Sequence, residues 1–453
     1  MPGQHRTPTW FRDAKLGIFV HWGLYSVPGY ADPEAPDPAQ FLRDLREMKD
    51  IGGRAPYAEW YLNGLRIPGS ATAVHHSRTY GEQVPYADFQ RPFDEHAREA
   101  DFGEWADFFA EAGARYVVLV TRHLDGYPLW PTDVVNPHVD PGFRSGRDLV
   151  GDIAVAVRTR GIRLGLYYAG GTDWTYTQRP VRTILDMVAQ SALGEDYAEH
   201  ATAHWRELIA RYRPDVLWND MGWPRESDPE ELFERYYEAV PDGAVNDRWF
   251  NYEAAAAGRR PPADFATHEY AVPETGPAGA WELTRGLGRS FGYDARETAA
   301  DLLDGRQLVD LLVQVVSEGG NLLINVGPDG SGVIPEVQRR PLQELGAWLR
   351  ANGAAIFGCR RRSVSHVRAV DGSTVRFTED GAHVYAIVRP RCPSAGLVVD
   401  GIRPAADARA RVLGTEEDVP WTQDGTGVRL LLPSATGGQS YVVAVPRGAD
   451  GDP

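Results

Sequence analysis

The feature that most constrains the fold is a series of eight short β-runs, most of them followed by a helical pattern. The runs cover residues 16–20, 116–120, 163–168, 215–218, 243–245, 264–267, 288–291 and 321–326. The fifth, sixth and seventh runs are weaker signals than the others. Strands that alternate with helices are typical of a parallel sheet, so the series predicts an α/β fold with a (β/α)8-like barrel.

The stretches between the runs carry helical signals. An apolar helix face recurs through residues 102–112 and ends at Gly113. A second pattern near residues 306–317 stops at Gly319-Gly320, and Pro335 suits the first turn of a helix that runs to residue 349. The connection 33–91 is too long for a simple loop. Because it is rich in Pro, Gly and Tyr, we expect it to lie over the catalytic face.

After about residue 355 the pattern changes. Short strands are expected at residues 375–377, 384–388, 397–399, 428–432 and 441–445, separated by Gly, Asp and Pro turns and without a helical pattern between them. This spacing predicts a β-sandwich. We therefore expect two domains, a barrel over residues 1–355 and a C-terminal β-sandwich over residues 356–453, with a frayed tail from Gly448.

Composition limits the classes of partner. Lys and Arg number 47 against 63 Asp and Glu, and the formal net charge of −16 argues against nucleic acid or an anionic membrane as the main partner. No stretch approaches the about 18 consecutive apolar residues of a membrane span. The start of the chain lacks the pattern of a signal peptide, so we expect a cytoplasmic protein. Cys359 and Cys392 are the only cysteines, which predicts no disulfide framework.

Two of the β-runs are followed by carboxylates. Asp220 follows Val216-Leu-Trp218 after one residue, and Glu269 follows the run at 264–267. A charged side chain at the end of a buried strand breaks the local pattern, and such breaks tend to mark functional sites. Carboxylates supplied by two strands are also the usual arrangement for glycoside hydrolysis. Asp220 and Glu269 are therefore the catalytic candidates.

Other residues compete for these roles. Glu253, Glu274 and Glu282 are rivals of Glu269, whereas Asp215 opens its run and should point to the stabilising face of the barrel. The pair His75-His76 suggests a metal site, but adjacent residues rarely share a ligand geometry, so we predict no metal there.

Seven segments, in order along the chain, are similar to the motifs of the α-L-fucosidases of glycoside hydrolase family 29. They cover residues 10–28 (Trp-Phe-Arg-Asp-Ala-Lys-Leu-Gly-Ile-Phe-Val-His-Trp-Gly-Leu-Tyr-Ser-Val-Pro), 56–61, 218–220, 246–249, 281–285, 290–293 and 319–328. The resemblance runs from about residue 9 to 355 and more loosely through the β-rich tail. It implies a barrel followed by a β-sandwich, and an exo-acting retaining enzyme that releases terminal α-L-fucose through a covalent glycosyl-enzyme.

The resemblance also implies roles for particular residues. Asp220 in the Trp-x-Asp motif would be the nucleophile, and Glu269 the acid/base. Matching sugar-binding positions are His21, Glu59, Trp60, His123, Tyr168, Trp218 and Arg248, and Phe291 matches a residue that packs against the C6 methyl group. The implied partner is a fucosylated oligosaccharide or glycoside, with no cofactor and no metal ion. A homo-oligomer rests on family analogy alone.

One motif departs from the family pattern. The usual Lys-His-His-Asp-Gly-Phe reads Arg122-His-Leu-Asp-Gly-Tyr127 here, so Leu124 replaces a sugar-binding His. Losing such a donor could weaken binding by about 1–3 kcal/mol. The alternatives left open are retaining machinery with altered sugar specificity and a catalytically inactive carbohydrate-binding protein. A metal-dependent amidohydrolase would need a His-x-His at the first strand, where this chain has His21-Trp22-Gly23.

Overall fold

The computed structural model describes residues 5–191, 193–273, 276–368, 374–389, 397–399, 402, 404–405, 407–415, 417–425, 427–432 and 440–448. Eight parallel strands form one curled sheet in the order β5-β4-β3-β2-β1-β8-β7-β6. The strands are β1 (Leu16–Val20), β2 (Tyr116–Arg122), β3 (Arg163–Ala169), β4 (Val216–Asp220), β5 (Ala244–Val245), β6 (Ala266–Glu269), β7 (Trp281–Gly286) and β8 (Asn321–Val326).

The barrel closes between β5 and β6, a boundary we call the β5–β6 seam. A single parallel bridge joins Asn246 to Phe265 there. Next to it, the Asp264 amide donates to the Val245 carbonyl at 2.8 Å, and the Val245 amide donates to Asp264 Oδ2 at 2.9 Å. A carboxylate thus takes the place of part of a strand ladder, since the two-residue β5 is too short to supply one.

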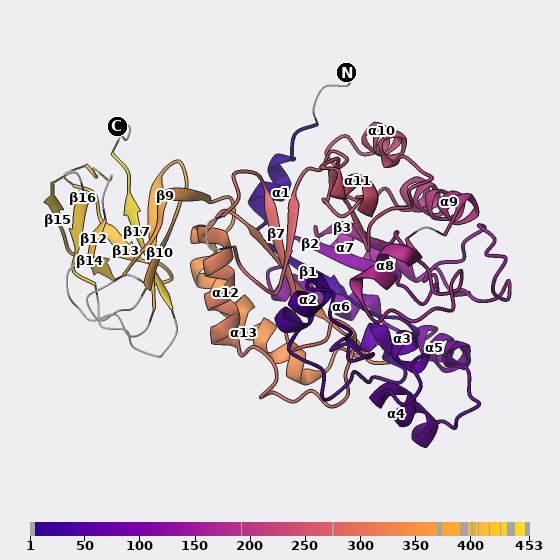
Figure 1. The fold of residues 1–453 in the computed structure, drawn as a ribbon. Helices are drawn as coiled ribbons and strands as arrows, with labels where there is room; N and C mark the ends of the chain where they lie inside the picture. The colour runs from indigo at the N-terminus through magenta and orange to yellow at the C-terminus, as the bar shows by residue number, and fades with distance from the viewer. Residues whose placement is uncertain are drawn as a thin grey trace.

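Helices cover the outside of the barrel and part of its open end (Figure 1). The α-helices are α1 (Thr9–Ala14), α2 (Pro38–Arg46), α3 (Tyr61–Leu65), α4 (Ala71–Thr79), α5 (Gln90–Ala97), α6 (Phe102–Glu111), α7 (Leu149–Thr159), α8 (Ile184–Gln190), α9 (Glu195–Tyr212), α10 (Pro229–Ala239), α11 (Tyr252–Ala256), α12 (Gly305–Ser317) and α13 (Glu336–Asn352). The 3-10 helices are η1 (Leu24–Ser26), η2 (Ala58–Trp60), η3 (Tyr86–Phe89) and η4 (Gly353–Ala355).

The alternation of strands and helices is less regular than the sequence predicts. The long connection between β1 and β2 contains α2 to α6 and three short 3-10 helices, η1, η2 and η3. Between β6 and β7, the described residues contain no helix, and α11 between β5 and β6 has only five residues. The helices predicted near residues 102–112, 306–317 and 335–349 are present as α6, α12 and α13. Among the described residues, no helix combines the length and apolar character needed to cross a bilayer.

The predicted seventh strand is wrong. Residues 288–291 form a connection, and β7 lies earlier, at Trp281–Gly286. Its apolar signal is weakened by Glu282, which points into the barrel and accepts hydrogen bonds from Trp218 Nε1 and Tyr116 Oη. A buried carboxylate that is fully paired is compatible with a strand, although its charge hides the strand in the sequence pattern.

Side chains alternate between two apolar layers along the strands. Phe19 and Trp218 belong to a cluster inside the barrel, whereas Ile18 and Leu217 belong to the cluster between the sheet and the surrounding helices. Both faces of these strands are buried, which is typical of a parallel sheet covered by helices. At the carboxyl ends of the strands, the inside cluster borders a group of polar residues.

The C-terminal region is built from two antiparallel sheets, in the orders β14-β13-β17-β11-β10-β9 and β12-β16-β15. The strands are β9 (Arg360–Arg368), β10 (Thr374–Glu379), β11 (His383–Val388), β12 (Leu397–Val399), β13 (Ala410–Val412), β14 (Asp418–Val419), β15 (Trp421–Asp424), β16 (Gly427–Leu430) and β17 (Tyr441–Pro446). A separate apolar cluster fills the space between the sheets. The predicted barrel and β-sandwich are both confirmed.

The β-sandwich lies against α12 and α13 (Figure 1). Glu318, just after α12, accepts hydrogen bonds from Ser365 at 2.7 Å and Arg376 at 3.3 Å. Trp348 of α13 donates to the Ser440 carbonyl at 2.7 Å. The boundary predicted at residue 355 stays a prediction. Cys392 and residues 449–453 of the predicted tail lie outside the described residues.

Candidate active site

A cavity of about 520 Å³ opens at the ends of the barrel strands. Asp220, the last residue of β4, and Glu269, the last residue of β6, both line it. Every predicted site residue except Tyr168 lines the same cavity: Asp220, Glu269, His21, Glu59, Trp60, His123, Trp218, Arg248 and Phe291. Residues separated by up to 270 positions in the chain therefore meet at one place.

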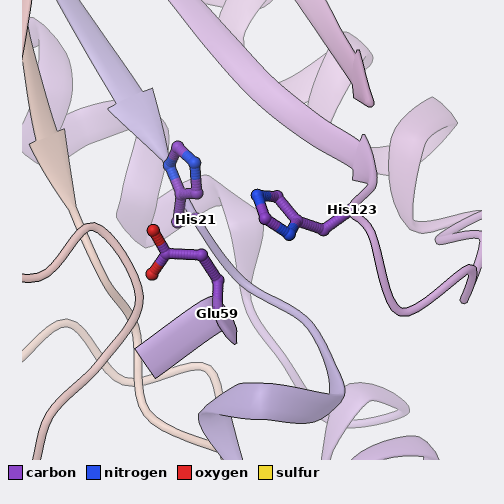
Figure 2. Close-up of side chains that lie close together, drawn as sticks. All are labelled: His21, Glu59 and His123. Carbon is purple, nitrogen blue, oxygen red and sulfur yellow. The ribbon is translucent and has the colours of Figure 1, made fainter. Parts of the chain in front are cut away.

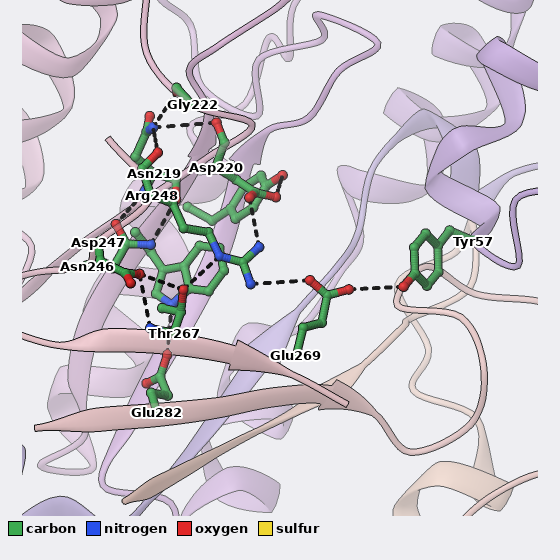
Figure 3. A network of polar contacts seen from close by, with 12 residues as sticks. Tyr57, Asn219, Asp220, Gly222, Asn246, Asp247, Arg248, Thr267, Glu269 and Glu282 are labelled. Atoms are coloured by element: carbon green, nitrogen blue, oxygen red, sulfur yellow. Dashed lines mark hydrogen bonds and ion pairs between the residues drawn. The ribbon is translucent and has the colours of Figure 1, made fainter. Parts of the chain in front are cut away.

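Arg248 connects the two carboxyl groups (Figure 3). Its Nη1 lies 2.9 Å from Asp220 Oδ1, and its Nη2 lies 3.2 Å from Glu269 Oε2. The guanidinium also lies over the Trp218 ring, 4.8 Å from the ring centroid. A planar guanidinium with fixed donors holds two acceptors in a defined geometry. One side chain thus fixes both catalytic candidates relative to each other.

Each carboxyl group has a tyrosine as its second partner. Tyr167 Oη donates to Asp220 Oδ2 at 3.0 Å, and Tyr57 Oη donates to Glu269 Oε1 at 3.0 Å. Burial raises the pKa of both tyrosines well above the ordinary range, so both remain hydroxyl donors. Every oxygen of the two carboxyl groups therefore has a hydrogen-bond or ion-pair partner in the same cluster, which limits the movement of both groups.

The surroundings of Glu269 favour its protonated form. Burial raises the pKa of its carboxyl, and the charge of Asp220 acts in the same direction. The Arg248 guanidinium and the hydrogen bond from Tyr57 oppose the shift, but the pKa of Glu269 stays above its ordinary value. Burial tends to lower the pKa of Arg248, yet Asp220 and Glu269 raise it overall, so the guanidinium remains charged.

Arg248 is itself held from below. Its Nε donates to Thr267 Oγ1 at 2.8 Å, and that hydroxyl donates to Asp247 Oδ1 at 2.7 Å. Trp218, whose ring lies under the guanidinium, donates from Nε1 to Glu282 Oε1 at 2.8 Å. These contacts form a buried polar network in which each member restricts the next.

The rivals of Glu269 occupy other places. Glu282 lies beneath Trp218 rather than on the cavity wall, and burial raises the pKa of its carboxyl to about 7. Glu253 is exposed and lies 3.5 Å from Arg225. Glu274 is outside the described residues. Asp215 lies at the opposite end of the barrel, where it pairs with Arg163 at 2.6 Å, as its place at the start of β4 predicts.

The deep end of the cavity is formed by His21, Glu59 and His123 (Figure 2). His21 Nδ1 and Asn325 Oδ1 are hydrogen-bonded at 2.6 Å, and Glu59 Oε2 accepts from the Gly292 amide at 2.7 Å. The His123 ring stacks on Tyr167 with a centroid distance of 5.5 Å. All three side chains are buried.

Burial keeps this group of residues uncharged. It lowers the pKa of His21 to about 4 and that of His123 well below the ordinary value, and it raises the pKa of Glu59 to about 8. Neutral imidazoles and a protonated carboxyl offer both donors and acceptors, which suits the hydroxyl groups of a sugar. The same three side chains could also hold a metal ion, because one ligand atom from each lies within 4.8 Å of the others.

An apolar corner adjoins these polar residues. The Phe291 ring lies 5.0 Å from the His21 ring and 5.5 Å from the Tyr57 ring. Trp60 lies against Trp174 and also lines the cavity. A corner of this kind accepts an alkyl group beside polar groups that bind hydroxyls.

Tyr168 is the one predicted site residue that the structure does not bring to the cavity. Its hydroxyl is hydrogen-bonded to His204 on α9 at 2.9 Å, on the outer face of β3 and away from the cavity. The neighbouring Tyr167 faces inward and contacts Asp220. Successive strand residues point to opposite faces, so a shift of one position exchanges an outside residue for an inside one. The apolar run 163–168 gives no sign of which face is which, since both are buried.

Leu124 and the His75-His76 pair are also away from the cavity lining. Leu124 is buried in the inside cluster that contains Trp60 and Trp174. His75 stacks on Tyr30 with ring centroids 3.9 Å apart, and His76 is hydrogen-bonded to Tyr61 and to the Val84 carbonyl. The departure at Leu124 therefore removes a polar side chain without adding a new surface to the cavity.

Sequence reasoning missed three residues of the site. Tyr57 lies in the motif 56–61 and contacts Glu269, Tyr167 contacts Asp220, and Asn325 of β8 orients His21. Asn325 also donates to the Phe291 carbonyl at 2.6 Å, so it joins the polar and apolar sides of the cavity. A polar residue after the apolar stretch Leu322-Leu-Ile324 was the available signal for Asn325.

This arrangement defines a class of enzyme. Two carboxyl groups from different strands face one cavity, one of them has a raised pKa, and the deep end of the cavity carries uncharged groups that bind hydroxyls. A barrel with this constellation is a glycoside hydrolase.

Comparison with known proteins identifies the family. A family model described as Alpha-L-fucosidase matches residues 2–354. The tissue alpha-L-fucosidase of Bos taurus is 30% identical over 444 residues, which are 94% of this chain and 84% of that protein. An alpha-L-fucosidase of Dictyostelium discoideum is 31% identical over 403 residues, which are 86% of this chain and 80% of that protein. The solved structure of Thermotoga maritima alpha-fucosidase in complex with fucose is 39% identical, with a TM-score of 0.82 and 97% of each chain covered.

The chain belongs to the alpha-L-fucosidase family. The resemblance found in the sequence motifs is thereby confirmed, as is the prediction that the protein is a glycosidase.

Proposed function

We propose that the protein releases terminal α-L-fucose from fucosylated glycosides, with retention of configuration at the anomeric carbon. The observation that carries the proposal is the contact of Arg248 with both Asp220 and Glu269. In retaining glycosidases the two carboxyl groups are about 5–5.5 Å apart, whereas inverting enzymes leave room for a water molecule between them. A single guanidinium shared by both groups favours the shorter separation.

Asp220 acts as the nucleophile in this proposal. Its carboxylate attacks C1 of the fucosyl group, and the bond from C1 to the leaving oxygen breaks. The sugar is then linked to Asp220 as an ester. Arg248 and Tyr167 support this role because each donates to one oxygen of the carboxylate, and together they orient it at the cavity wall.

Glu269 acts as acid and then as base. In the first step it gives its proton to the leaving oxygen, and its raised pKa supports this because the proton is held closer to neutral pH. In the second step the Glu269 carboxylate accepts a proton from water, the water oxygen bonds to C1, and Asp220 leaves. Both carboxyl groups return to their starting forms.

Sugar recognition follows from the deep end of the cavity. His21, Glu59 and His123 would bind the ring hydroxyls, while Phe291 would lie against the methyl group that distinguishes fucose from most hexoses. A hexose with a 6-hydroxyl would leave that polar group without a partner in the apolar corner, which disfavours it. The buried end of the cavity supports exo action on a terminal residue.

The first test is the stereochemical course. Hydrolysis of 4-nitrophenyl α-L-fucoside, followed by NMR from the start of the reaction, should show the α-anomer of fucose as the first product. Asp220→Gly should nearly abolish turnover, and added azide should restore it and yield β-L-fucosyl azide. A first product of β configuration, or near-normal activity of Asp220→Gly, would contradict the proposal.

The second test separates the acid role of Glu269 from binding. Glu269→Ala should lose about 10²–10⁴-fold in kcat/KM on a fucoside with an alcohol leaving group. It should lose far less on the 4-nitrophenyl fucoside, because a good leaving group needs little protonation. Equal losses on both substrates would remove Glu269 from the acid role.

A metal-dependent hydrolase is the second candidate, favoured by the cluster of His21, Glu59 and His123. A bound cation would require an ionised Glu59, whereas burial favours the protonated carboxyl. The retaining proposal expects full activity after dialysis against a chelator. Loss of activity that Zn²⁺ restores would favour the metal-dependent reading.

A further inference from the structure

The cavity has a second side, which is apolar. Phe41, Leu42 and Leu45 of α2 line it together with Ile184 and Met187 of α8. We call these five residues the apolar wall. They share one cavity with Asp220 and Glu269, and that cavity is larger than one monosaccharide requires. Residual space therefore lies between the carboxyl groups and the apolar wall.

The apolar wall lies on the side of the proposed acid. Tyr57 contacts Glu269 Oε1 through its hydroxyl, and its ring lies 5.3 Å from the Phe41 ring. Leu42 and Met187 pack against the same cluster that contains Tyr57. A leaving group whose oxygen is protonated by Glu269 starts beside Tyr57, so the space that it enters is bounded by this wall.

The chemistry of the wall discriminates between classes of leaving group. None of its five side chains carries a nitrogen or oxygen, and the only charged residue of α2 on the cavity is Arg46 at the helix end. Hydroxyl groups pressed against such a surface lose hydrogen bonds to water without replacement. Aryl and alkyl groups instead gain from being removed from water.

We infer that the apolar wall is a leaving-group site and that the preferred substrates are α-L-fucosides with an aryl or alkyl aglycone. This inference rests on the function proposed above and adds the class of aglycone to it. Leu42, Ile184 and Met187 are only partly buried, whereas Phe41 and Leu45 are buried, so these three wall residues have surface available to a ligand.

The experiment compares three substrates. Two are aryl fucosides whose phenols are matched in acidity, one of them bearing a butyl chain; the third is α-L-fucosyl fluoride, whose leaving group is too small to reach the wall. In the unaltered protein, kcat/KM should be about 3- to 10-fold higher for the butyl substrate than for its matched partner. A fucosyl disaccharide should be a poorer substrate than either aryl fucoside.

Two variants locate the effect. Met187→Gln, nearly equal in volume, and Leu42→Gln should each lower the ratio of kcat/KM for the butyl substrate to that for the fluoride about 3- to 10-fold. This ratio does not depend on the fraction of folded protein. Leu185→Gln is the matched control, because it introduces Gln in α8 at a side chain that is 60% exposed and away from the cavity. In this variant the ratio of kcat/KM for the butyl substrate to that for the fluoride should equal that of the unaltered protein.

The outcomes separate the two proposals. Equal kcat/KM for the matched aryl fucosides, or ratios that stay constant in both wall variants, would overturn the leaving-group site while fluoride hydrolysis still supports the proposed function. A disaccharide that is preferred over both aryl fucosides would also overturn it. Failure to hydrolyse the fluoride as well as the aryl fucosides would overturn the proposed function itself.

Discussion

The two ends of β4 provide an internal comparison. At the start of the strand, Asp215 pairs with Arg163 at 2.6 Å and accepts a hydrogen bond from the Leu164 amide. At its end, Asp220 pairs with Arg248 at 2.9 Å. The carboxylate side chains are similarly accessible, 17% exposed for Asp215 and 13% for Asp220. Burial alone therefore does not separate a structural aspartate from a catalytic candidate.

The difference lies in the count of charges. At the start of β4, one guanidinium meets one carboxylate and the charges balance. At its end, one guanidinium is shared by Asp220 and Glu269, so two ionised carboxylates would leave an excess negative charge in a buried cluster. Burial raises the pKa of Glu269, and the charge of Asp220 adds to the shift, so the Glu269 carboxyl keeps its proton to higher pH and the excess is reduced. A cation shared by two carboxyl groups thus distinguishes the cavity end of β4 from its other end.

The largest expected contrast is between the two aspartates. Asp220→Asn should lower kcat by about 10⁴-fold or more, because an amide is a poor nucleophile. Asp215→Asn makes the same change in the same strand and should keep kcat within about twofold. Hydrolysis of 4-nitrophenyl α-L-fucoside measures both. Comparable losses of kcat in the two variants would show that the two ends of β4 do not differ in their importance for activity.

The two arginines should differ next. Arg248→Lys replaces a planar fork by a point charge that cannot hold two carboxyl groups in fixed positions, so kcat should fall about 10²–10³-fold. Arg163→Lys is the matched control at the other end, where one charge serves one carboxylate, and kcat should be retained. The same assay reports both variants. Full activity in Arg248→Lys would mean that bridging is not required.

One pH-dependent contribution to stability comes from Glu59 in the cavity. The pKa of Glu59 is about 8 in the folded protein, against an ordinary value of 4.5. Between these values the unfolded chain has lost the proton that the folded protein keeps, so stability from this group is complete below about pH 4.5 and is lost as the pH rises to 8. Glu59→Gln should remove this loss, by roughly 3–4 kcal/mol between pH 5 and 8.

Urea unfolding of parent and variant at the two pH values measures this difference. Glu104→Gln, on a side chain that is 63% exposed, is the control for the same chemical change at the surface, and its pH dependence should follow that of the parent. If Glu59→Gln and the parent lose stability in parallel, Glu59 is not protonated in the folded protein.

The smallest effect belongs to the stability of the structural end. Asp215→Asn weakens the pair with Arg163, whose side chain is 40% exposed, and keeps the shape of the residue. The free energy of unfolding should fall by about 0.5–1 kcal/mol, as is usual for pairs partly open to water. Urea unfolding at pH 7 tests this value. A loss above about 3 kcal/mol would show that both ends of β4 depend equally on their ion pairs.

Much of the fold could be predicted because long apolar runs and helix ends are local signals. The eight parallel strands and the β-sandwich follow the runs in the sequence, and β7 is the strand that was misplaced. Its charged residues Glu282 and Arg285 hide the pattern, and Glu282 is tolerated only because Trp218 and Tyr116 satisfy it. Such long-range pairing has no signature within a short segment.

Site residues that lie in a recognisable motif could be predicted from the sequence. Residues whose position depends on which face of a strand they occupy could not. Tyr168 was chosen over Tyr167 because both faces of β3 are buried and the strand shows no alternation. His123 reaches the cavity past a register shift between Val120 and Arg122 in β2, which changes which face the following residues present. Tyr57 and Asn325 act through partners more than 200 positions away in the chain.

The β5–β6 seam links the stability of the barrel to the geometry of the candidate active site. Arg248 follows β5, whereas Thr267 and Glu269 belong to β6, so the bonds that Arg248 makes to both residues span this junction. At its lower edge, His5 and Tyr237 hold Asp264 in the same way. Side-chain contacts thus replace part of the backbone hydrogen bonding between these two strands. The residues proposed to act on the sugar also close the barrel. Altering them should loosen the ring of strands at its opening, which makes amide exchange at Val245 and Asp264, whose N–H groups bond across the β5–β6 seam, a sensitive reporter of the candidate active site.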